Sequence, residues 1–177
     1  ILAVGRLAAR KGNGFLLRSF AKVVESTDAN LVIIGRGSLR RKLISMASRL
    51  GIGDRVSIES SMNFQEVAEM YRAADLVVYP SYYEGQGLIP LEAMSSGTPV
   101  VTVNHGPLPE MVDETVGALF EMGSVESFSE AIVSESSSNS ALQEKGDRGR
   151  SRVMAKFTLE NNANDFLDIY KRAISNS

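Results

Sequence analysis

Two glutamates, Glu84 and Glu92, stand with seven residues between them in a segment that follows the apolar run 76–79. Gly87 and Pro90 lie between them, and these residue types are typical of a loop that leads into a helix. Carboxylates placed in this way can hold the hydroxyl groups of a sugar or ribose, while backbone N–H groups at the helix start meet phosphate oxygens. The segment therefore favours binding of a phosphorylated sugar or a nucleotide.

The start of the helix after this loop determines what each residue in it can do. We expect Pro90 at the first helical position, where its missing N–H costs nothing, and Glu92 in the first turn. Stabilisation of the helix dipole, worth about 0.3–1 kcal/mol, explains Glu92 at least as well as ligand binding does. Glu84 lies in a loop and is harder to explain structurally, which favours contact with a ligand. The backbone amides at the positive end of the helix are those of Gly87, Leu88 and Ile89.

A second group of charges, Arg6, Arg10 and Lys11, follows the first apolar run of the chain. Its spacing matches neither the GxGxxG fingerprint of dinucleotide sites nor the phosphate-binding Walker loop. Arg6 and Lys11 suit a diphosphate, because an arginine fork and a lysine point charge can both bind its oxygens. Three solvated surface cations are an equally good reading of this local sequence, and Arg10 is the expected bystander.

The elements that position these residues alternate between short apolar runs and amphipathic segments. We predict strands at 1–5, 30–35, 56–59, 76–79, 100–103 and 117–120. We predict helices at 14–26, 38–50, 64–74, 90–96, 108–113, 126–135, 141–156 and 159–174. Gly51 is placed to end the second of these helices in a left-handed cap, and Asn63 with Glu66 is expected to form a capping-box-like start of the third. The strands are continuous Val, Ile and Leu runs, which indicates a parallel sheet covered on both faces. The fold class is therefore α/β: a doubly wound, six-stranded parallel sheet of the Rossmann-like kind.

The C-terminal part departs from this alternation. Residues 134–140 are rich in Ser and Asn and are predicted to form an exposed loop. Gly146 and Gly149 argue against an unbroken helix over 141–156. Apolar residues at helical spacing in the last helix, among them Phe166 and Tyr170, predict that one of its faces packs back on the body. No domain break is visible, so residues 1–177 are predicted to form a single domain.

In open α/β sheets, ligands bind outside the carboxyl ends of the strands, where the strand order reverses. With the common order 3-2-1-4-5-6, this point lies between the first and fourth strands. The loops that leave these two strands carry Arg6 and Lys11 on one side and Glu84 on the other. We therefore expect cations and carboxylates to meet across one crevice.

Composition narrows the possible functions. The 19 basic and 21 acidic residues nearly balance and show no basic face for nucleic acid. There is no cysteine, and the single histidine, His105, excludes a multi-histidine metal cluster. No apolar run approaches the roughly 20 residues that span a bilayer. A reducing, cytoplasmic setting is expected. The chain opens on Ile1 without an initiator methionine, so we expect a piece of a longer protein.

Several short motifs lie along almost the whole chain. They are Val4-Gly5-Arg6-Leu7 with Lys11-Gly12, Leu31-Val32-Ile33-Ile34-Gly35-Arg36-Gly37, Ala73-Ala74-Asp75-Leu76, Pro80-Ser81 through Glu84-Gly85 to Leu91-Glu92-Ala93-Met94, Ser96-Gly97-Thr98-Pro99-Val100-Val101, and Pro109-Glu110. In these motifs the chain, from residue 1 to about 174, resembles the C-terminal, donor-binding half of retaining GT-B glycosyltransferases of group 1, also called family four.

The resemblance implies a role for each matched residue. Arg6 and Lys11 match the cations that bind the diphosphate, and with Glu84, which meets hydroxyl groups of the donor sugar, they are the catalytic candidates. Glu92 matches the residue that holds the ribose. By analogy, the nucleobase is expected around Arg36 and residues 60–62. The other donor-binding candidates are Gly5, Gly87, Leu88 and Ile89.

The sequence departs from the family pattern at three places. Gln86 stands where the family usually has Phe, Cys or a similar residue, which puts the shape of the sugar pocket in question. Gly106-Pro107 replaces a common pair of glycines, and Ser60-Ser61 replaces a frequent glycine near the expected base. None of these changes removes a matched charged residue.

The activity implied by the resemblance is transfer of a sugar from a nucleoside diphosphate to an acceptor hydroxyl, with retention at the anomeric carbon. The resemblance also implies no cofactor and no metal requirement. An N-terminal, acceptor-binding domain is expected outside this chain, so the chain alone should bind donor without turnover. Acceptors open at this point are a saccharide, a lipid-linked saccharide or a small molecule, and membrane association through the other domain also stays open. Two alternatives remain: a related GT-B epimerase or phosphorylase, and a non-catalytic nucleotide-sugar-binding or scaffold subunit.

Overall fold

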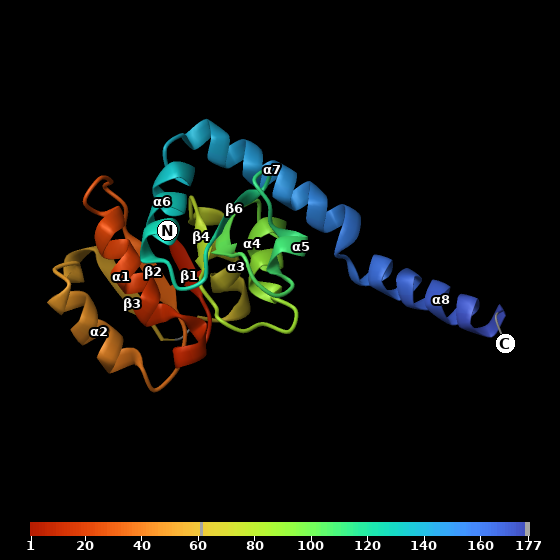
Figure 1. Cartoon of the computed structure of the whole chain (residues 1–177), viewed down its shortest axis with the longest axis horizontal. Helices are drawn as coiled ribbons and strands as arrows, with labels where there is room; N and C mark the ends of the chain where they lie inside the picture. The colour runs from red at the N-terminus through yellow and green to blue at the C-terminus, as the bar shows by residue number, and fades with distance from the viewer. Residues whose placement is uncertain (61, 176–177) are drawn as a thin grey trace.

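The computed structural model describes residues 1–60 and 62–175, and six parallel strands form one sheet in this part of the chain (Figure 1). The strands are β1 (Leu2–Val4), β2 (Leu31–Ile34), β3 (Val56–Glu59), β4 (Val77–Tyr79), β5 (Val100–Val103) and β6 (Gly117–Phe120). Their order is β3-β2-β1-β4-β5-β6, which confirms the doubly wound prediction. Every neighbouring pair is parallel, and the order reverses between β1 and β4.

Helices cover both faces of the sheet. They are η1 (Ala9–Lys11), α1 (Asn13–Val23), α2 (Arg40–Arg49), η2 (Gly53–Arg55), α3 (Phe64–Ala73), α4 (Leu88–Ser95), α5 (Leu108–Met111), α6 (Val125–Glu135), α7 (Asn139–Lys156) and α8 (Leu159–Ser175). The core on one face takes its helical side chains mainly from α1, α2 and α6, and the core on the other from α3, α4, α5 and α7. All six strands and all eight α-helices lie within a few residues of the predicted bounds.

Two predicted helix ends are seen in the geometry. Asn63 accepts a hydrogen bond from the Glu66 amide at 3.0 Å, and the Glu66 carboxylate accepts from the Asn63 amide at 2.6 Å, which forms the capping box expected for α3. Gly51 follows α2 with φ of +72°. Both ends follow from local residue chemistry and needed no tertiary information.

Helix α4 begins two residues earlier than predicted. Its N-cap is Gly87 with φ of +82°, so Leu88 is the first helical residue and Pro90 the third. Proline is tolerated there because the first four helical N–H groups have no partner within the helix. Glu92 consequently lies at the start of the second turn, and its predicted place in the first turn was wrong. A side chain at position 87 would also place its Cβ 2.6 Å from Leu108 Cδ2.

Helix α7 packs against the body and confirms the predicted helix, which runs unbroken through Gly146 and Gly149 although both had argued against its continuity. Glycine stands at these two positions because other atoms lie close to the helix. A Cβ at position 146 would lie 2.0 Å from the Gly97 carbonyl oxygen, and one at 149 would lie 3.2 Å from Met94 Cγ. The glycines lower helix propensity but allow α7 to approach α4. Arg152 of α7 also holds the helix in place, since its Nη2 donates to both oxygens of the Asp113 carboxylate, at 3.0 and 2.9 Å.

The predicted packing of the last helix on the body was wrong. Helix α8 buries none of its residues, and it projects away from the rest of the molecule (Figure 1). Phe166 is 56% exposed and Tyr170 63% exposed. The apolar periodicity was identified correctly, but periodicity specifies only which face is apolar and not what covers it. None of the helices in the described residues has the length and apolarity that a bilayer crossing requires.

Candidate functional site

The loops after β1 and β4 are held together by their backbones. The Tyr82 amide donates to the Arg10 carbonyl oxygen at 2.9 Å, and the Tyr82 ring packs against Phe15 of α1 at 6.2 Å between centroids. Gly12, with φ of +70°, leaves no room for a side chain, since a Cβ would lie 2.1 Å from the Pro80 carbonyl oxygen. This close approach places Lys11 at the carboxyl end of β4.

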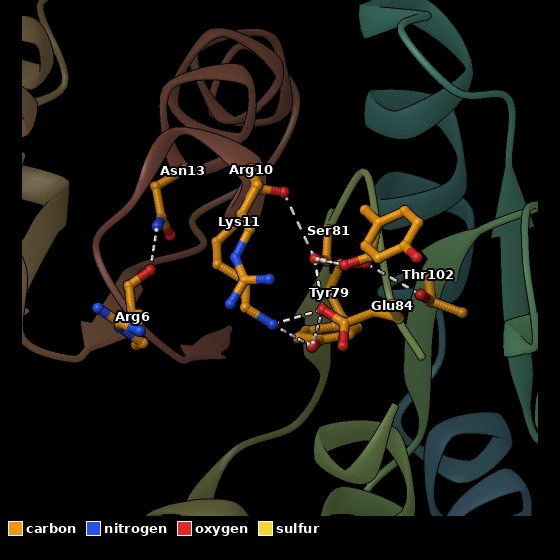
Figure 2. A network of polar contacts seen from close by, with 9 residues as sticks. Arg6, Arg10, Lys11, Asn13, Tyr79, Ser81, Glu84 and Thr102 are labelled. Carbon is orange, nitrogen blue, oxygen red and sulfur yellow. Dashed lines mark hydrogen bonds and ion pairs between the residues drawn. The ribbon is translucent and has the colours of Figure 1, made fainter. Parts of the chain in front are cut away.

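Lys11 and Glu84 form an ion pair in this position (Figure 2). The side chain of Lys11 is 15% exposed and that of Glu84 13% exposed, so the pair is largely shielded from water. Lys11 Nζ also donates to the Tyr79 hydroxyl at 2.8 Å. The Tyr79 hydroxyl donates to Glu84 Oε1 at 2.6 Å, and the Ser81 hydroxyl donates to the same oxygen at 2.5 Å. A cation, a carboxylate and two hydroxyl groups thus form one network at the point where the strand order reverses.

This network shifts the pKa values of Glu84 and Tyr79. Burial by itself raises the pKa of the Glu84 carboxyl, but the hydrogen bonds from Lys11, Ser81 and Tyr79 outweigh it, so the pKa lies below its usual value. Burial raises the pKa of the Tyr79 phenol well above its ordinary value, and the bond to Glu84 raises it further. Glu84 is therefore ionised at neutral pH, and Tyr79 keeps the proton that it donates.

Glu92 is held from a different direction. Its Oε2 accepts a hydrogen bond of 2.9 Å from the hydroxyl of Tyr71, a buried residue of α3. Burial raises the pKa of the Tyr71 phenol well above its ordinary value, and the nearby Glu92 charge adds to the effect. Glu92 lines a hollow of about 210 Å³ between α3 and α4. The residues around it are Met62, Phe64, Val67, Ala68, Tyr71, Ser95 and Ser96.

Arg6 and Arg36 lie in a neighbouring cavity of about 510 Å³ at the ends of β1 and β2. Arg36 Nε donates to the Ser60 carbonyl oxygen at 2.9 Å. The other residues that line this cavity are Val4, Gly5, Ile34, Gly35, Gly37, Ser60 and Met62. Of the region expected to meet the base, Ser61 lies outside the described residues.

The predicted charged residues therefore lie in three adjoining groups, and direct contact between a cation and a carboxylate is made in one of them. Lys11 and Glu84 touch, whereas Arg6 and Glu92 line separate hollows that share Met62 in their walls. Figure 2 shows Arg6 at a distance from the Lys11–Glu84 network. The exposed Arg10 touches this network through its backbone oxygen, which accepts from the Ser81 hydroxyl at 3.4 Å.

The uncapped start of α4 adds backbone donors to the site. No side chain within the described residues caps the helix at Gly87, and neither Leu88 nor Ile89 has a predecessor within the helix to which its amide could donate. These N–H groups carry the positive end of the helix dipole, which favours an anion.

Sequence reasoning missed three residues that hold the carboxylates: Tyr71, Tyr79 and Ser81. Tyr79 and Ser81 are two apart at the end of β4, and this period-two spacing was a signal that both could face Glu84. Tyr71 gave no local signal, because it lies in α3, 21 residues before Glu92. In the described part of the chain, no group of three or more His, Cys, Asp or Glu side chains is arranged to hold a metal ion.

Comparison with known proteins identifies relatives over most of the chain. Residues 1–152 match the family described as glycosyl transferases group 1. An uncharacterized glycosyltransferase of Methanocaldococcus jannaschii is 39% identical over 120 residues, which are 68% of this chain and 31% of that protein. The D-inositol 3-phosphate glycosyltransferase of Segniliparus rotundus is 32% identical over 97% of this chain and 39% of its own length. The chain thus spans about a third to two-fifths of these curated relatives.

Solved structures show the same architecture. A sucrose-phosphate synthase from Thermosynechococcus elongatus superposes with a TM-score of 0.85 at 28% identity, over 99% of this chain and 46% of that chain. A variant of S. aureus TarM in complex with Fondaparinux, alpha-GlcNAc-glycerol and UDP superposes with a TM-score of 0.86 at 25% identity, over 96% and 35%.

Proposed function

This chain belongs to the glycosyl transferases group 1 family, and we propose that it forms the donor-binding part of a retaining glycosyltransferase. In this proposal it binds a nucleoside diphosphate sugar, whose sugar is passed to an acceptor hydroxyl with retention at the anomeric carbon. The observation that carries the proposal is the contact between Lys11 and Glu84 at the point where the strand order reverses. Ligands of open α/β sheets bind at that point.

The charges of the site suit the parts of such a donor. Lys11 and Arg6 would neutralise the diphosphate, together with the backbone amides of Gly87, Leu88 and Ile89 at the start of α4. As the bond between the sugar and the diphosphate breaks, negative charge grows on the leaving group. Donors that are already in place stabilise this charge without reorganisation, and removal of one such donor typically lowers the rate about 10²–10³-fold.

The remaining residues would hold the two sugar rings and the base. Glu84 would accept hydrogen bonds from hydroxyl groups of the donor sugar, and Glu92, held by Tyr71, those of the ribose. The cavity beside Gly5 and Arg36 would receive the base. Its glycine-rich wall supports this assignment, because it brings backbone atoms close to the cavity.

We extend the proposal to catalysis without a metal cofactor, since Lys11, Arg6 and the helix start supply positive charge where a metal would otherwise act. The acceptor, whether a saccharide, a lipid-linked saccharide or a small molecule, would be bound by a domain outside this chain. The relatives' greater length supports this division. The 177-residue chain would then bind donor but not turn it over, in a protein that works in the cytoplasm.

Isothermal titration calorimetry of the 177-residue chain tests the proposal. The panel is UDP, GDP and ADP, together with UDP-glucose, GDP-mannose and ADP-glucose. We expect one nucleotide to bind best and Lys11→Ala to weaken its binding about tenfold or more, because a charge-assisted hydrogen bond is lost. Lys42→Ala is the matched control, since Lys42 is an exposed cation of α2 outside the site. Equal affinity in the unmodified chain and in Lys11→Ala would mean that the site is misplaced.

A further inference from the structure

One oxygen of the Glu84 carboxylate, Oε1, takes three hydrogen bonds from the protein (Figure 2). The donors are the Lys11 ammonium, the Tyr79 hydroxyl and the Ser81 hydroxyl. The other oxygen, Oε2, accepts no hydrogen bond from any residue that the structure describes. The described residues therefore hold the carboxylate through Oε1, and Oε2 is available to a ligand.

The three donors differ in how firmly they are fixed. Tyr79 is 3% exposed and Ser81 is 1% exposed, and both stand at the end of β4. The Thr102 hydroxyl donates to the Tyr79 carbonyl oxygen at 2.9 Å, which ties this strand end to β5. Lys11, by contrast, reaches Glu84 through four rotatable methylene groups. The two hydroxyl groups are thus rigid donors, and the ammonium is a movable one.

Arrival of a diphosphate changes this balance. Its oxygens compete with Glu84 for Lys11, because an ammonium pairs with either anion. A shielded carboxylate that loses its cation must keep other hydrogen bonds or pay the cost of desolvation. Tyr79 and Ser81 can supply them, since neither hydroxyl depends on Lys11 for its position.

We propose that Tyr79 and Ser81 are positioning residues that keep Glu84 aimed at the donor sugar after Lys11 has turned to the diphosphate. This inference rests on the proposed function and adds two residues to it. A carboxylate gripped at Oε1 presents Oε2 in one direction, so it discriminates between sugar hydroxyl groups by their position. Loss of these hydrogen bonds to Oε1 should lower the affinity that the sugar adds and leave the affinity for the nucleotide unchanged.

Calorimetry of the 177-residue chain separates the two parts. The measured quantity is the gain in affinity of the best nucleoside diphosphate sugar of the panel over the same diphosphate without sugar. In Tyr79→Phe and in Ser81→Ala, we expect this gain to fall about three- to tenfold, the range of one hydrogen bond. Affinity for the plain diphosphate should stay within about twofold, because its contacts are unchanged.

Tyr82→Phe is the matched control, since the Tyr82 hydroxyl makes no hydrogen bond within the described residues and its ring packs on Phe15. A carbon-13 NMR titration of Glu84 with the plain diphosphate bound gives a second readout. The pKa of Glu84 should be higher in Tyr79→Phe than in the unmodified chain, because a hydrogen bond to its charged form is lost. Tyr82→Phe should leave this pKa unchanged. If Tyr79→Phe melts too early for titration, Ser81→Ala carries both measurements.

The outcomes are distinct. A sugar gain that survives in both variants overturns the inference and leaves the proposed function standing. The same holds if both variants lose affinity for plain diphosphate and diphosphate sugar equally, or if the sugar adds no affinity in the unmodified chain. Absence of any nucleotide binding by the unmodified chain overturns the proposed function and this inference with it.

Discussion

At the scale of single residues, the site is built from pairs in which a buried hydroxyl group holds a carboxylate. Tyr79 holds Glu84 from the end of β4, and Tyr71 holds Glu92 from α3. In both pairs burial and the neighbouring carboxylate raise the pKa of the phenol, so the tyrosine remains a donor. Each glutamate is thereby oriented as an acceptor for hydroxyl groups, and the hydrogen bonds to Glu84 also lower the pKa of its carboxyl.

The role proposed for Glu92 predicts a preference that one substitution should remove. The unmodified chain should bind the best nucleoside diphosphate of the panel more tightly than its 2′,3′-dideoxy analogue. In Glu92→Gln this preference should fall about tenfold, because hydrogen bonds to a charged acceptor become bonds to a neutral one. Calorimetry measures both ligands, and Glu69→Gln, at an exposed position of α3, is the control. An undiminished preference in Glu92→Gln would show that the ribose does not bind at Glu92.

At the scale of elements, close backbone contact decides where helices lie. Gly12 lets the β1 loop meet the β4 loop, and Gly146 lets α7 meet the turn after α4. Both glycines stand against a carbonyl oxygen of another element, at Pro80 and at Gly97 respectively. In each case the missing side chain sets the distance between two elements, and through it the shape of the body that carries the site.

The two glycines of α7 predict responses to alanine of different size. Gly146→Ala should lower the free energy of unfolding by about 1–3 kcal/mol, because its Cβ would collide with backbone that cannot move freely. Gly149→Ala should cost less, since the nearest atoms belong to the flexible Met94 side chain and alanine adds about 1 kcal/mol of helix propensity. Urea denaturation followed by circular dichroism measures both. Equal stability of the two variants would contradict this account of α7.

At the scale of the whole molecule, the chain consists of a packed α/β body and one helix that stands apart from it (Figure 1). The body buries two cores, one on each face of the sheet. Helix α8 buries none of its residues. Even its apolar residues Leu159 and Ile174 are 91% and 76% exposed. Folding of the body therefore draws little free energy from α8.

Removal of residues 159–177 should leave the stability of the body almost unchanged. We expect the midpoint of thermal unfolding to shift by less than about 2 °C, because little apolar area is uncovered. Differential scanning calorimetry gives the midpoint. The control is a chain that ends at residue 135, which also loses α7 with its buried Leu142 and Val153 and should unfold at a clearly lower temperature. A large shift in the shorter deletion would show that α8 contributes to the fold.

The sequence by itself determined the elements, their order in the sheet and the meeting of the β1 and β4 loops. These features follow from local apolar patterns, from caps such as Asn63 with Glu66, and from the topology of parallel sheets. Contacts between residues distant in the chain were decided only in three dimensions. These contacts include the one between Tyr71 and Glu92, the close approach of α7 at its two glycines, and the absence of packing on α8. They depend on how closely elements approach each other, and no local sequence pattern specifies that distance.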